Sequence, residues 1–397
     1  MESGSRITRV VLENFKSIAF CDVRLGPLTI LVGPNGAGKS NFLDSLRFLS
    51  QVTAGPTSKA FHDRGGFLRV VRRGINSDAH IGIRIEFVIK NGVSGFYAAR
   101  LRRWTKVDYV VAHERCWLDN SPSPNGYEVE NGAVVSGQVP GRNVVGLDQL
   151  HLPIAASAEA FKPVFDFLQG CHFYSFNPKD FRRPVASDPA DTLAADGGNL
   201  ANVLYHISHQ HRDVFDRIVE YLRAILPALN NVGVLDLQGY SALEFKVSQT
   251  SFSPEEISDG TLRSLAVLVA LFQYRGGASG ARLVAIEEPE GAVHPAATGV
   301  LFDAMREASA SVQVLAATHS ADLLDKKDIK SDSILSVDLD GGTTRIGCLD
   351  QTGREALRER LYTPGELMRM NYLRPETRQV PNDAEMESLL FGDLVPA

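Results

Sequence analysis

Residues 33–40 read GPNGAGKS, which has the residue types and spacing of a phosphate-binding loop. Backbone N–H groups of such a turn wrap phosphate oxygens, the lysine adds a positive charge at the β- and γ-phosphates, and the serine hydroxyl ligates Mg²⁺. An ordinary glycine-rich turn is the alternative. The residues assigned to nucleotide binding are Gly33, Pro34, Asn35, Gly36, Ala37, Gly38, Lys39, Ser40 and Asn41.

Two carboxylates follow an apolar run further along the chain. Residues 282–286 predict a buried strand, and Glu287, Glu288 and Pro289 come directly after it. A carboxylate at the carboxyl end of a strand beside a phosphate loop can hold Mg²⁺, and a second can orient the attacking water. We assign Glu287 to the metal, together with Ser40, and Glu288 to the general base. An acidic helix start is the alternative, because Glu and Pro both suit a first helical turn.

A histidine ends the next apolar run. Residues 312–316 predict another buried strand, and Thr318, His319 and Ser320 follow it. At the end of a strand near the γ-phosphate, His319 could donate a hydrogen bond to that phosphate. A lone histidine is more often structural, so its place after the two glutamates carries the functional interpretation.

A serine-rich helix start lies between the phosphate loop and the glutamate pair. Ser258, Asp259 and Gly260 precede a helix predicted over 261–274. Ser-Asp-Gly-Thr at this position is typical of a helix cap. The same N–H groups also suit an anion, but these residues taken alone favour the cap.

Apolar strands and helices alternate around these residues, as in an α/β fold. Residues 81–89 alternate apolar side chains and predict a half-buried strand, and 96–104 predict its partner, with Arg100 and Arg102 on one face. The DGG at 340–342 predicts a hairpin between edge strands. Further strands are predicted over 7–13, 28–32, 232–237 and 243–249, and helices over 39–51, 158–168, 200–226 and 296–308.

The composition is that of a soluble globular protein, with 44% hydrophobic and 22% charged residues in 397. The sequence has no apolar run long enough for a membrane span, no apolar core of a secretory signal near residue 1, and four scattered cysteines, so we expect a cytoplasmic protein without a membrane partner. The net charge is −6, yet residues 59–106 carry eleven Lys or Arg against three acids. Residues 382–397 carry four acids and no base.

Taken in order, these motifs resemble ABC-type ATPases. Within them the chain is similar to the SMC/RecF/OLD branch, in the group of AAA family ATPases of the AAA_21 type, including ATPase subunits of bacterial anti-phage defence systems. The segments that carry the likeness are LENFKSI at 12–18, IEEPE at 286–290, HP at 294–295 and ATHS at 317–320. The specific motifs cover about 1–50 and 250–350.

The resemblance implies a P-loop NTPase of ABC type, with a mixed central sheet flanked by helices, a large α+β insertion and no coiled-coil arm. It implies ATP and Mg²⁺ as ligands and ATP hydrolysis as the reaction. It also implies a homodimer in which Ser258 and Gly260 of one copy contact the γ-phosphate held by Lys39 of the other. ATP binding would close this dimer and hydrolysis would open it.

The same resemblance suggests a division of the chain. The expected parts are 1–50, the first part of the ATPase head; 51–254, an inserted lobe with a basic β region at about 59–150 and a helical region at about 155–230; 255–350, the second part of the head; and 351–397, C-terminal helices and an acidic tail.

Several features depart from the family pattern. The usual Asp before the catalytic Glu is Glu287 here, and the LSGGQ-like signature is reduced to residues 258–260. The glutamine loop has no clear position: Gln51 lies too close to the phosphate-loop helix, and Gln138, Gln149 and Gln169 are candidates. The acids Asp322, Asp325, Asp328 and Asp332 predict a solvated helix face.

We expect the ATPase to act as a sensor or regulator for a separately encoded effector protein, in bacterial antiviral defence. A RecF-like DNA repair clamp and an ATP-bound scaffold with little turnover are the alternatives. The basic segment, residues 59–106, could bind the phosphates of DNA. The alternatives are that its arginines form a solvated surface or pair with acids elsewhere in the chain. The arginines predicted to contact DNA are Arg69, Arg72, Arg73, Arg100, Arg102 and Arg103.

Overall fold

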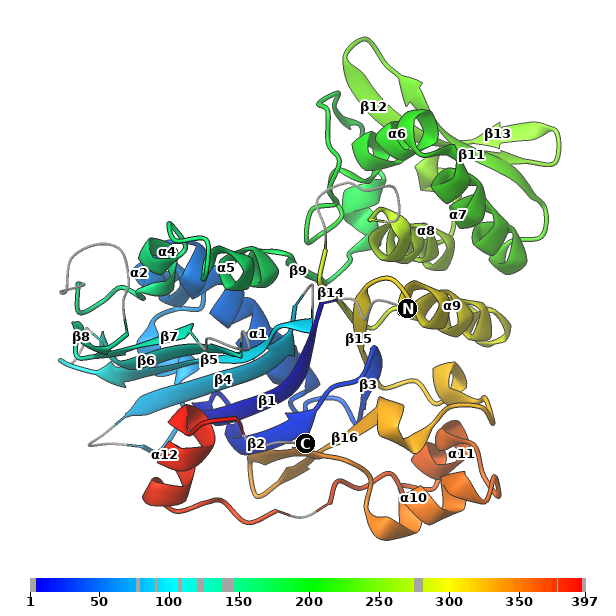
Figure 1. Cartoon of the computed structure of the whole chain (residues 1–397). Coiled ribbons are helices and arrows are strands. Elements are labelled where there is room, and N and C mark those ends of the chain that lie inside the picture. The colour runs from blue at the N-terminus through cyan, green and yellow to red at the C-terminus, as the bar shows by residue number, and fades with distance from the viewer. Residues whose placement is uncertain are drawn as a thin grey trace.

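The computed structural model describes residues 5–75, 79–89, 92–105, 109–119, 125–137, 146–274, 281–376 and 378–394. Within these residues the chain forms a mixed sheet of 13 strands and a smaller sheet of four. Helices cover both faces of the parallel half of the large sheet (Figure 1). The predicted α/β class, with a mixed central sheet flanked by helices, is confirmed.

The large sheet has an antiparallel half and a parallel half joined by a hairpin. From the outer edge inward, the antiparallel strands are β8 (Ala133–Ser136), β7 (Asn125–Glu130), β6 (Tyr109–Asp119), β5 (Ser94–Arg103), β4 (His80–Val88), β1 (Arg6–Phe15) and β2 (Ile18–Arg24). The hairpin is β17 (Thr343–Gly347) with β16 (Ile334–Asp340), and the strands parallel to β16 are β3 (Leu28–Val32), β15 (Gln313–Thr318), β14 (Leu283–Glu287) and β9 (Cys171–Tyr174).

The short strands of the parallel half are apolar throughout because both of their faces are buried. In β3, Leu31 packs into one hydrophobic core, whereas its neighbours Ile30 and Val32 pack into the core on the opposite face. Strands β14 and β15 divide their side chains between the same two cores. Alternate residues of a strand point to opposite faces, so a strand inside a parallel sheet reads as a continuous apolar run.

Helices of the two layers hold these strands from either side. Helix α1 (Lys39–Ala54) contacts β9 and β15, while α8 (Asp259–Phe272) and α9 (Pro295–Ala308) contact β14 and β15. Their buried faces belong to opposite cores. The other helices are α2 (Thr57–His62), α3 (Phe67–Val70), α4 (Leu152–Ala155), α5 (Lys162–Gln169), α6 (Leu200–Gln210), α7 (Arg212–Ile225), α10 (Gln351–Arg358), α11 (Pro364–Arg369) and α12 (Asp383–Phe391).

The smaller sheet forms a separate layer beside α6 and α7, at the upper right of Figure 1. It contains β10 (Val185–Ala186), β12 (Tyr240–Val247), β11 (Leu229–Asp236) and β13 (Thr250–Phe252). Strands β4 to β8 continue the main sheet, and β9 pairs with β14 in its parallel half. The division of the chain into an ATPase head and an inserted lobe stays a prediction. None of the described helices is long and apolar enough to cross a membrane.

Three sequence predictions of secondary structure were wrong in detail. The helix predicted over 200–226 is two helices, because the backbone of His211 leaves the helical region between them. The DGG turn forms the predicted hairpin, but β16 and β17 lie inside the sheet, between β2 and β3, rather than at an edge. The acids of 322–332 do not share one helix face: Asp322 and Asp332 lie on separate 3-10 turns, and Asp325, which follows the first turn, pairs with Arg369.

Strand β4 was predicted to be half buried, and this was also wrong. Its second face is covered by α12, so Arg84 on that face is 1% exposed. The guanidinium of Arg84 donates to the carbonyl oxygens of Leu390 and Gly392, at 3.2 and 2.5 Å, and pairs with Glu86. A helix almost 300 residues further along the chain thus buries a face that local alternation marks as exposed.

Candidate functional site

The predicted phosphate loop joins β3 to α1 in the expected strand–turn–helix arrangement. Its glycines are needed for steric reasons. A Cβ at Gly33 would lie 2.0 Å from the carbonyl oxygen of Val337, and one at Gly38 would lie 2.2 Å from Oγ1 of Thr344. Gly36 and Gly38 also have positive φ angles, of 76° and 110°, which disfavour a side chain.

Lys39, the first residue of α1, folds its side chain back over this loop. Its ammonium donates to the carbonyl oxygens of Gly33 and Pro34 at 2.7 and 2.9 Å. Burial lowers the pKa of the Lys39 ammonium, and the nearby carboxylates of Glu288, Glu290 and Glu287 oppose this effect. The cation is therefore held against the loop, with three acids facing it.

Ser40 and Glu287 meet where β14 ends beside the start of α1. The Ser40 hydroxyl donates to Oε2 of Glu287 at 3.0 Å. Parallel strands bring their carboxyl ends to one edge of a sheet, and β15 lies between β3 and β14. The extra methylene of Glu287, compared with the usual Asp, therefore does not prevent its carboxylate from reaching the serine.

Glu288 and His319 form the second pair of this edge. Nδ1 of His319 lies 3.2 Å from Oε1 of Glu288, and both side chains are about half exposed. The backbone of Glu288 has a positive φ of 47°, which is strained for a residue with a side chain. Its N–H donates to the carbonyl oxygen of Ala317 at 2.8 Å, and its own carbonyl accepts from Arg263 at 3.0 Å. These two hydrogen bonds hold Glu288 in the position that faces His319.

The segment 258–260 begins α8 as a helix cap. The Ser258 hydroxyl accepts from the N–H of Thr261 at 3.2 Å. Arg182 donates to Oδ1 of Asp259 at 2.5 Å and to the carbonyl oxygen of Ile257 at 3.0 Å. A Cβ at Gly260 would lie 2.2 Å from the carbonyl oxygen of Ala292, so this glycine lets α8 pack against the loop after the glutamate pair. The cap is present, and contact of this segment with a nucleotide stays a prediction.

Three residues of the site had no assigned role in the sequence. Arg263 joins the carbonyl of Glu288 to that of Phe176, and Arg182 holds the start of α8. Glu290 is 6% exposed, and its Oε1 accepts from Thr318 at 2.5 Å. Burial raises the pKa of the Glu290 carboxyl, and the hydrogen bond from Thr318 opposes this effect. The sequence feature that could have pointed to Glu290 is the third glutamate in the run Glu-Glu-Pro-Glu, residues 287–290.

The six arginines predicted to contact DNA lie on two different segments, and their contacts differ. Arg69, Arg72 and Arg73 line a cavity of about 470 Å³ together with Lys16 and Asn41, beside the start of α1. Arg72 donates there to Thr343 at 2.9 Å. The other three, Arg100, Arg102 and Arg103, lie on β5.

The arginines of β5 are already engaged or covered. Arg100 pairs with Glu387 of α12 and, at 3.3 Å, with Glu13. These two ion pairs agree with the alternative interpretation, in which arginines of the basic segment pair with acids elsewhere in the chain. Nε of Arg103 donates to the carbonyl oxygen of Thr105 at 2.8 Å, and Nε of Arg102 is buried. We therefore remove Arg100 from the candidate DNA contacts. Lys106, at the end of the basic segment, lies outside the described residues.

The glutamine loop is not identified. Gln51 accepts from Arg64 at 2.7 Å, and Gln169 donates to the carbonyl oxygen of Ser50 at 3.2 Å, so both are used in packing around α1. Gln149 is exposed, and Gln138 lies outside the described residues.

Comparison with known families and structures gives one family and one fold. Residues 28–102 and 174–325, more than half of the chain, match the family AAA_21, described as "AAA domain, putative AbiEii toxin, Type IV TA system". No curated protein matches the chain.

Two solved structures of SMC heads share the fold. One is the SmcHead bound to the C-winged helix domain of ScpA, with a TM-score of 0.55 and 15% identity over 89% of this chain and 99% of that one. The other is the Smc head domain with an extended coiled coil bound to the C-terminal domain of ScpA from Pyrococcus furiosus, with a TM-score of 0.55 and 12% identity over 90% and 99%.

Proposed function

Since this chain belongs to the AAA_21 family and has the fold of SMC heads, it is a P-loop ATPase of ABC type in the SMC/RecF branch, and we propose that it binds Mg·ATP at the loop of residues 33–41 and hydrolyses it. The observation that carries this proposal is that the phosphate loop and the strand ends bearing Glu287, Glu288 and His319 lie together at one edge of the sheet. Ser40 meets Glu287 at 3.0 Å, and Glu288 meets His319 at 3.2 Å, at the edge where the phosphate loop opens.

The oxygen atoms of Ser40 and Glu287 suit magnesium. Mg²⁺ prefers hard oxygen ligands in octahedral geometry at 2.0–2.1 Å, so adjacent ligands lie about 2.9 Å apart. The two side-chain oxygens are 3.0 Å apart. When bound, the ion would neutralise phosphate charge, and the remaining ligands would come from water and the phosphates.

Each remaining residue has a role that follows from its position. Lys39 would exchange its contacts with the carbonyls of Gly33 and Pro34 for oxygens of the β- and γ-phosphates. Glu288 would accept the proton of the attacking water, and His319 would keep that carboxylate oriented or donate to the γ-phosphate. The partial exposure of this pair leaves room for water and substrate.

A second copy of the chain would complete the site. Ser258 and Gly260 lie at the N-terminus of the 14-residue helix α8, whose N–H groups and dipole favour an anion. We infer that these residues of one copy cover the γ-phosphate bound at Lys39 of the other. Losing the γ-phosphate on hydrolysis would remove the charge that bridges the two copies, which then separate.

Phosphate release by the purified chain is the direct test of the enzymatic proposal. Hydrolysis of ATP should need Mg²⁺ and stop when a chelator removes it. A chain that binds Mg·ATP but releases no phosphate above the uncatalysed rate is an ATP-held scaffold, and the proposal of turnover then fails.

We further infer that the ATPase regulates a separate effector protein in antiviral defence. The family description names a toxin and a type IV TA system, and both SMC heads described above are bound to a domain of another protein, ScpA. This chain exposes large apolar side chains around α11, which suit a protein contact: Leu361, Tyr362, Met370 and Tyr372. Purification from the native operon should retain a stoichiometric partner encoded beside the ATPase, and a chain that elutes alone contradicts this role.

DNA binding, which a RecF-like clamp requires, can be tested at the cavity beside α1. Arg69 and Arg73 are exposed there, and among the residues that the structure describes neither has an acidic partner such as the one that engages Arg100. Changing both to alanine should weaken DNA binding and reduce the slope of log K against log salt by about two, since each phosphate contact releases about one counterion. Affinity measured over a salt series with ATP present gives this slope.

The matched control for these arginines is Arg306→Ala. Arg306 is also exposed, but its guanidinium is paired with Asp303 and Asp328, so its loss should leave the slope unchanged. Wild-type protein that shows no salt-sensitive DNA binding with ATP present removes DNA, and with it the clamp function, from this protein.

A further inference from the structure

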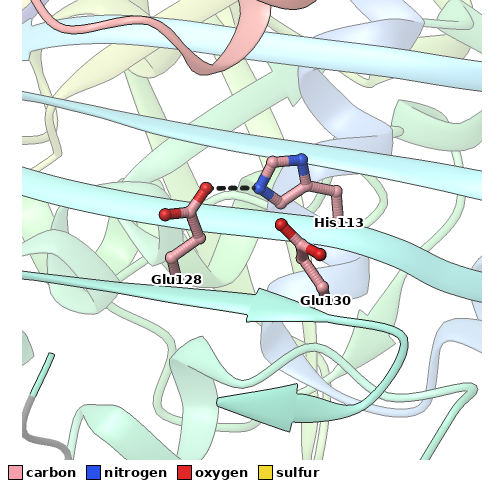
Figure 2. A group of neighbouring side chains, drawn as sticks. All are labelled: His113, Glu128 and Glu130. Atoms are coloured by element: carbon pink, nitrogen blue, oxygen red, sulfur yellow. Dashed lines mark hydrogen bonds and ion pairs between the residues drawn. The ribbon is translucent and has the colours of Figure 1, made fainter. Parts of the chain in front are cut away.

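A histidine and two glutamates gather on the antiparallel half of the sheet, apart from the phosphate loop. Figure 2 shows Glu128 and Glu130 on β7 with their carboxylates turned toward the imidazole of His113 on β6. His113 lies directly opposite Glu130 in the strand register, and Glu128 is two residues away on the same face of β7. One ligand atom from each of the three lies within 4.8 Å of the others.

Helix α12 fixes the far side of the histidine ring. Oε1 of Glu387 lies 3.3 Å from Nδ1 of His113, while Oε2 of the same carboxylate contacts Arg100. Phe391 stacks on the imidazole, with ring centroids 3.7 Å apart. A histidine whose second nitrogen faces a carboxylate is the arrangement that orients metal-binding histidines.

The charges around His113 favour a cation. Nε2 of the ring lies 2.8 Å from Oε1 of Glu128, so both ring nitrogens face carboxylates. A neutral imidazole has one N–H and can donate to only one of them. If Nδ1–H donates to Glu387, the lone pair of Nε2 points at the two carboxylates of β7, and a cation bound between them would make that arrangement favourable.

We propose that His113, Glu128 and Glu130 bind a divalent transition-metal ion of the Zn²⁺ class. Such ions take imidazole nitrogen at 2.0–2.1 Å and carboxylate oxygen at 2.0–2.2 Å. Small movements of the Glu128 and Glu130 carboxylates would bring their oxygens to these distances, with Oε1 of Glu128 moving slightly away from Nε2 of His113 to admit the ion. The imidazole selects Zn²⁺ over Mg²⁺ and Ca²⁺, which prefer oxygen alone. Water completes the coordination on the exposed side of Glu130.

This site is a property of the chain outside the family match. His113, Glu128 and Glu130 lie in the segment between 102 and 174 that the family does not cover, and Glu387 lies beyond its end. The ion would join β6 and β7 directly and, through His113 and Glu387, would fix α12 against the sheet. Its expected role is therefore to stabilise the antiparallel half, and the proposal does not depend on ATP hydrolysis.

Calorimetric titration with Zn²⁺ tests the proposal. The protein is first saturated with Mg²⁺ and a non-hydrolysable ATP analogue, because His319 and Glu288 form another histidine–carboxylate pair. The wild type should bind one Zn²⁺ per chain, and His113→Ala should abolish that binding. Glu387→Gln, which changes the partner of His113, should weaken binding by about 10–100-fold, and Glu130→Gln, which removes a ligand at an exposed position where folding is not at risk, should weaken it more.

His62→Ala is the matched control, because His62 is exposed on α2 and should leave Zn²⁺ affinity unchanged. Zn²⁺ should also raise the melting temperature of the wild type more than that of Glu130→Gln, since an ion that binds the folded state stabilises it in proportion to the logarithm of its affinity. Two results overturn the proposal: a wild type that binds no Zn²⁺, or binding that is equally tight in His113→Ala and Glu130→Gln.

Discussion

Replacing Glu288 by glutamine should slow ATP turnover by about 10²–10⁴-fold, which is about 3–5 kcal/mol of transition-state stabilisation. Glutamine keeps the size of the side chain but cannot accept the proton of the attacking water. Mg·ATP binding should persist, because the contacts of Lys39, Ser40 and Glu287 are not altered. The ATP-bound dimer should then accumulate, since the hydrolysis step that separates its two copies is blocked.

Phosphate release measures the turnover, and light scattering after gel filtration with ATP measures the dimer. Glu355→Gln is the matched control, because Glu355 is an exposed carboxylate on α10. It should behave as the wild type in both measurements. If Glu288→Gln turns over ATP at the wild-type rate, Glu288 is not the base, and the buried carboxyl of Glu290 becomes the next residue to examine.

The parts of the site that are local in sequence could be predicted. The loop at 33–40 can be recognised in the sequence because no residue with a side chain fits at Gly33 and Gly38. The backbone of Val337 packs against the first and the side chain of Thr344 against the second. The strands before Glu287 and His319 are buried on both faces and therefore read as plain apolar runs. Parallel strands end at the same edge, so naming the strands was enough to place the polar residues together.

Long-range contacts could not be predicted in this way. Arg263 acts on the backbone carbonyls of Glu288 and Phe176, and a bond to a carbonyl leaves no pattern in the partner's side chain. Charge counting placed Arg100 among the candidate DNA contacts and left pairing with an acid as an alternative, but it could not identify the partner, Glu387, which lies 287 residues away. Strand β16 was predicted at an edge, and only its first four residues are buried, but the first three of them pair with β3 inside the sheet.

Mixing two inactive variants should restore ATP hydrolysis if each site is shared between two copies. Lys39→Ala removes the cation that holds the phosphates, and Ser258→Arg places a bulky side chain where the partner's γ-phosphate would lie. Each variant alone should lose nearly all turnover. A heterodimer of the two has one site with both defects and one with neither, so an equal mixture should recover about a quarter of wild-type activity.

The design separates a shared site from simple loss of folding. Ser258 caps α8, and losing such a cap costs about 1 kcal/mol, so Asn382→Arg, which removes the side-chain cap of α12 at an exposed position, is the matched control and should stay active. Differently tagged copies show by pull-down that heterodimers have formed. If they form with ATP and the mixture still hydrolyses none, then Ser258 does not act on the ATP of the other copy. The positive end of α8 would then be a cap of its own chain alone, and ATP-driven closure of a dimer would lose its physical basis.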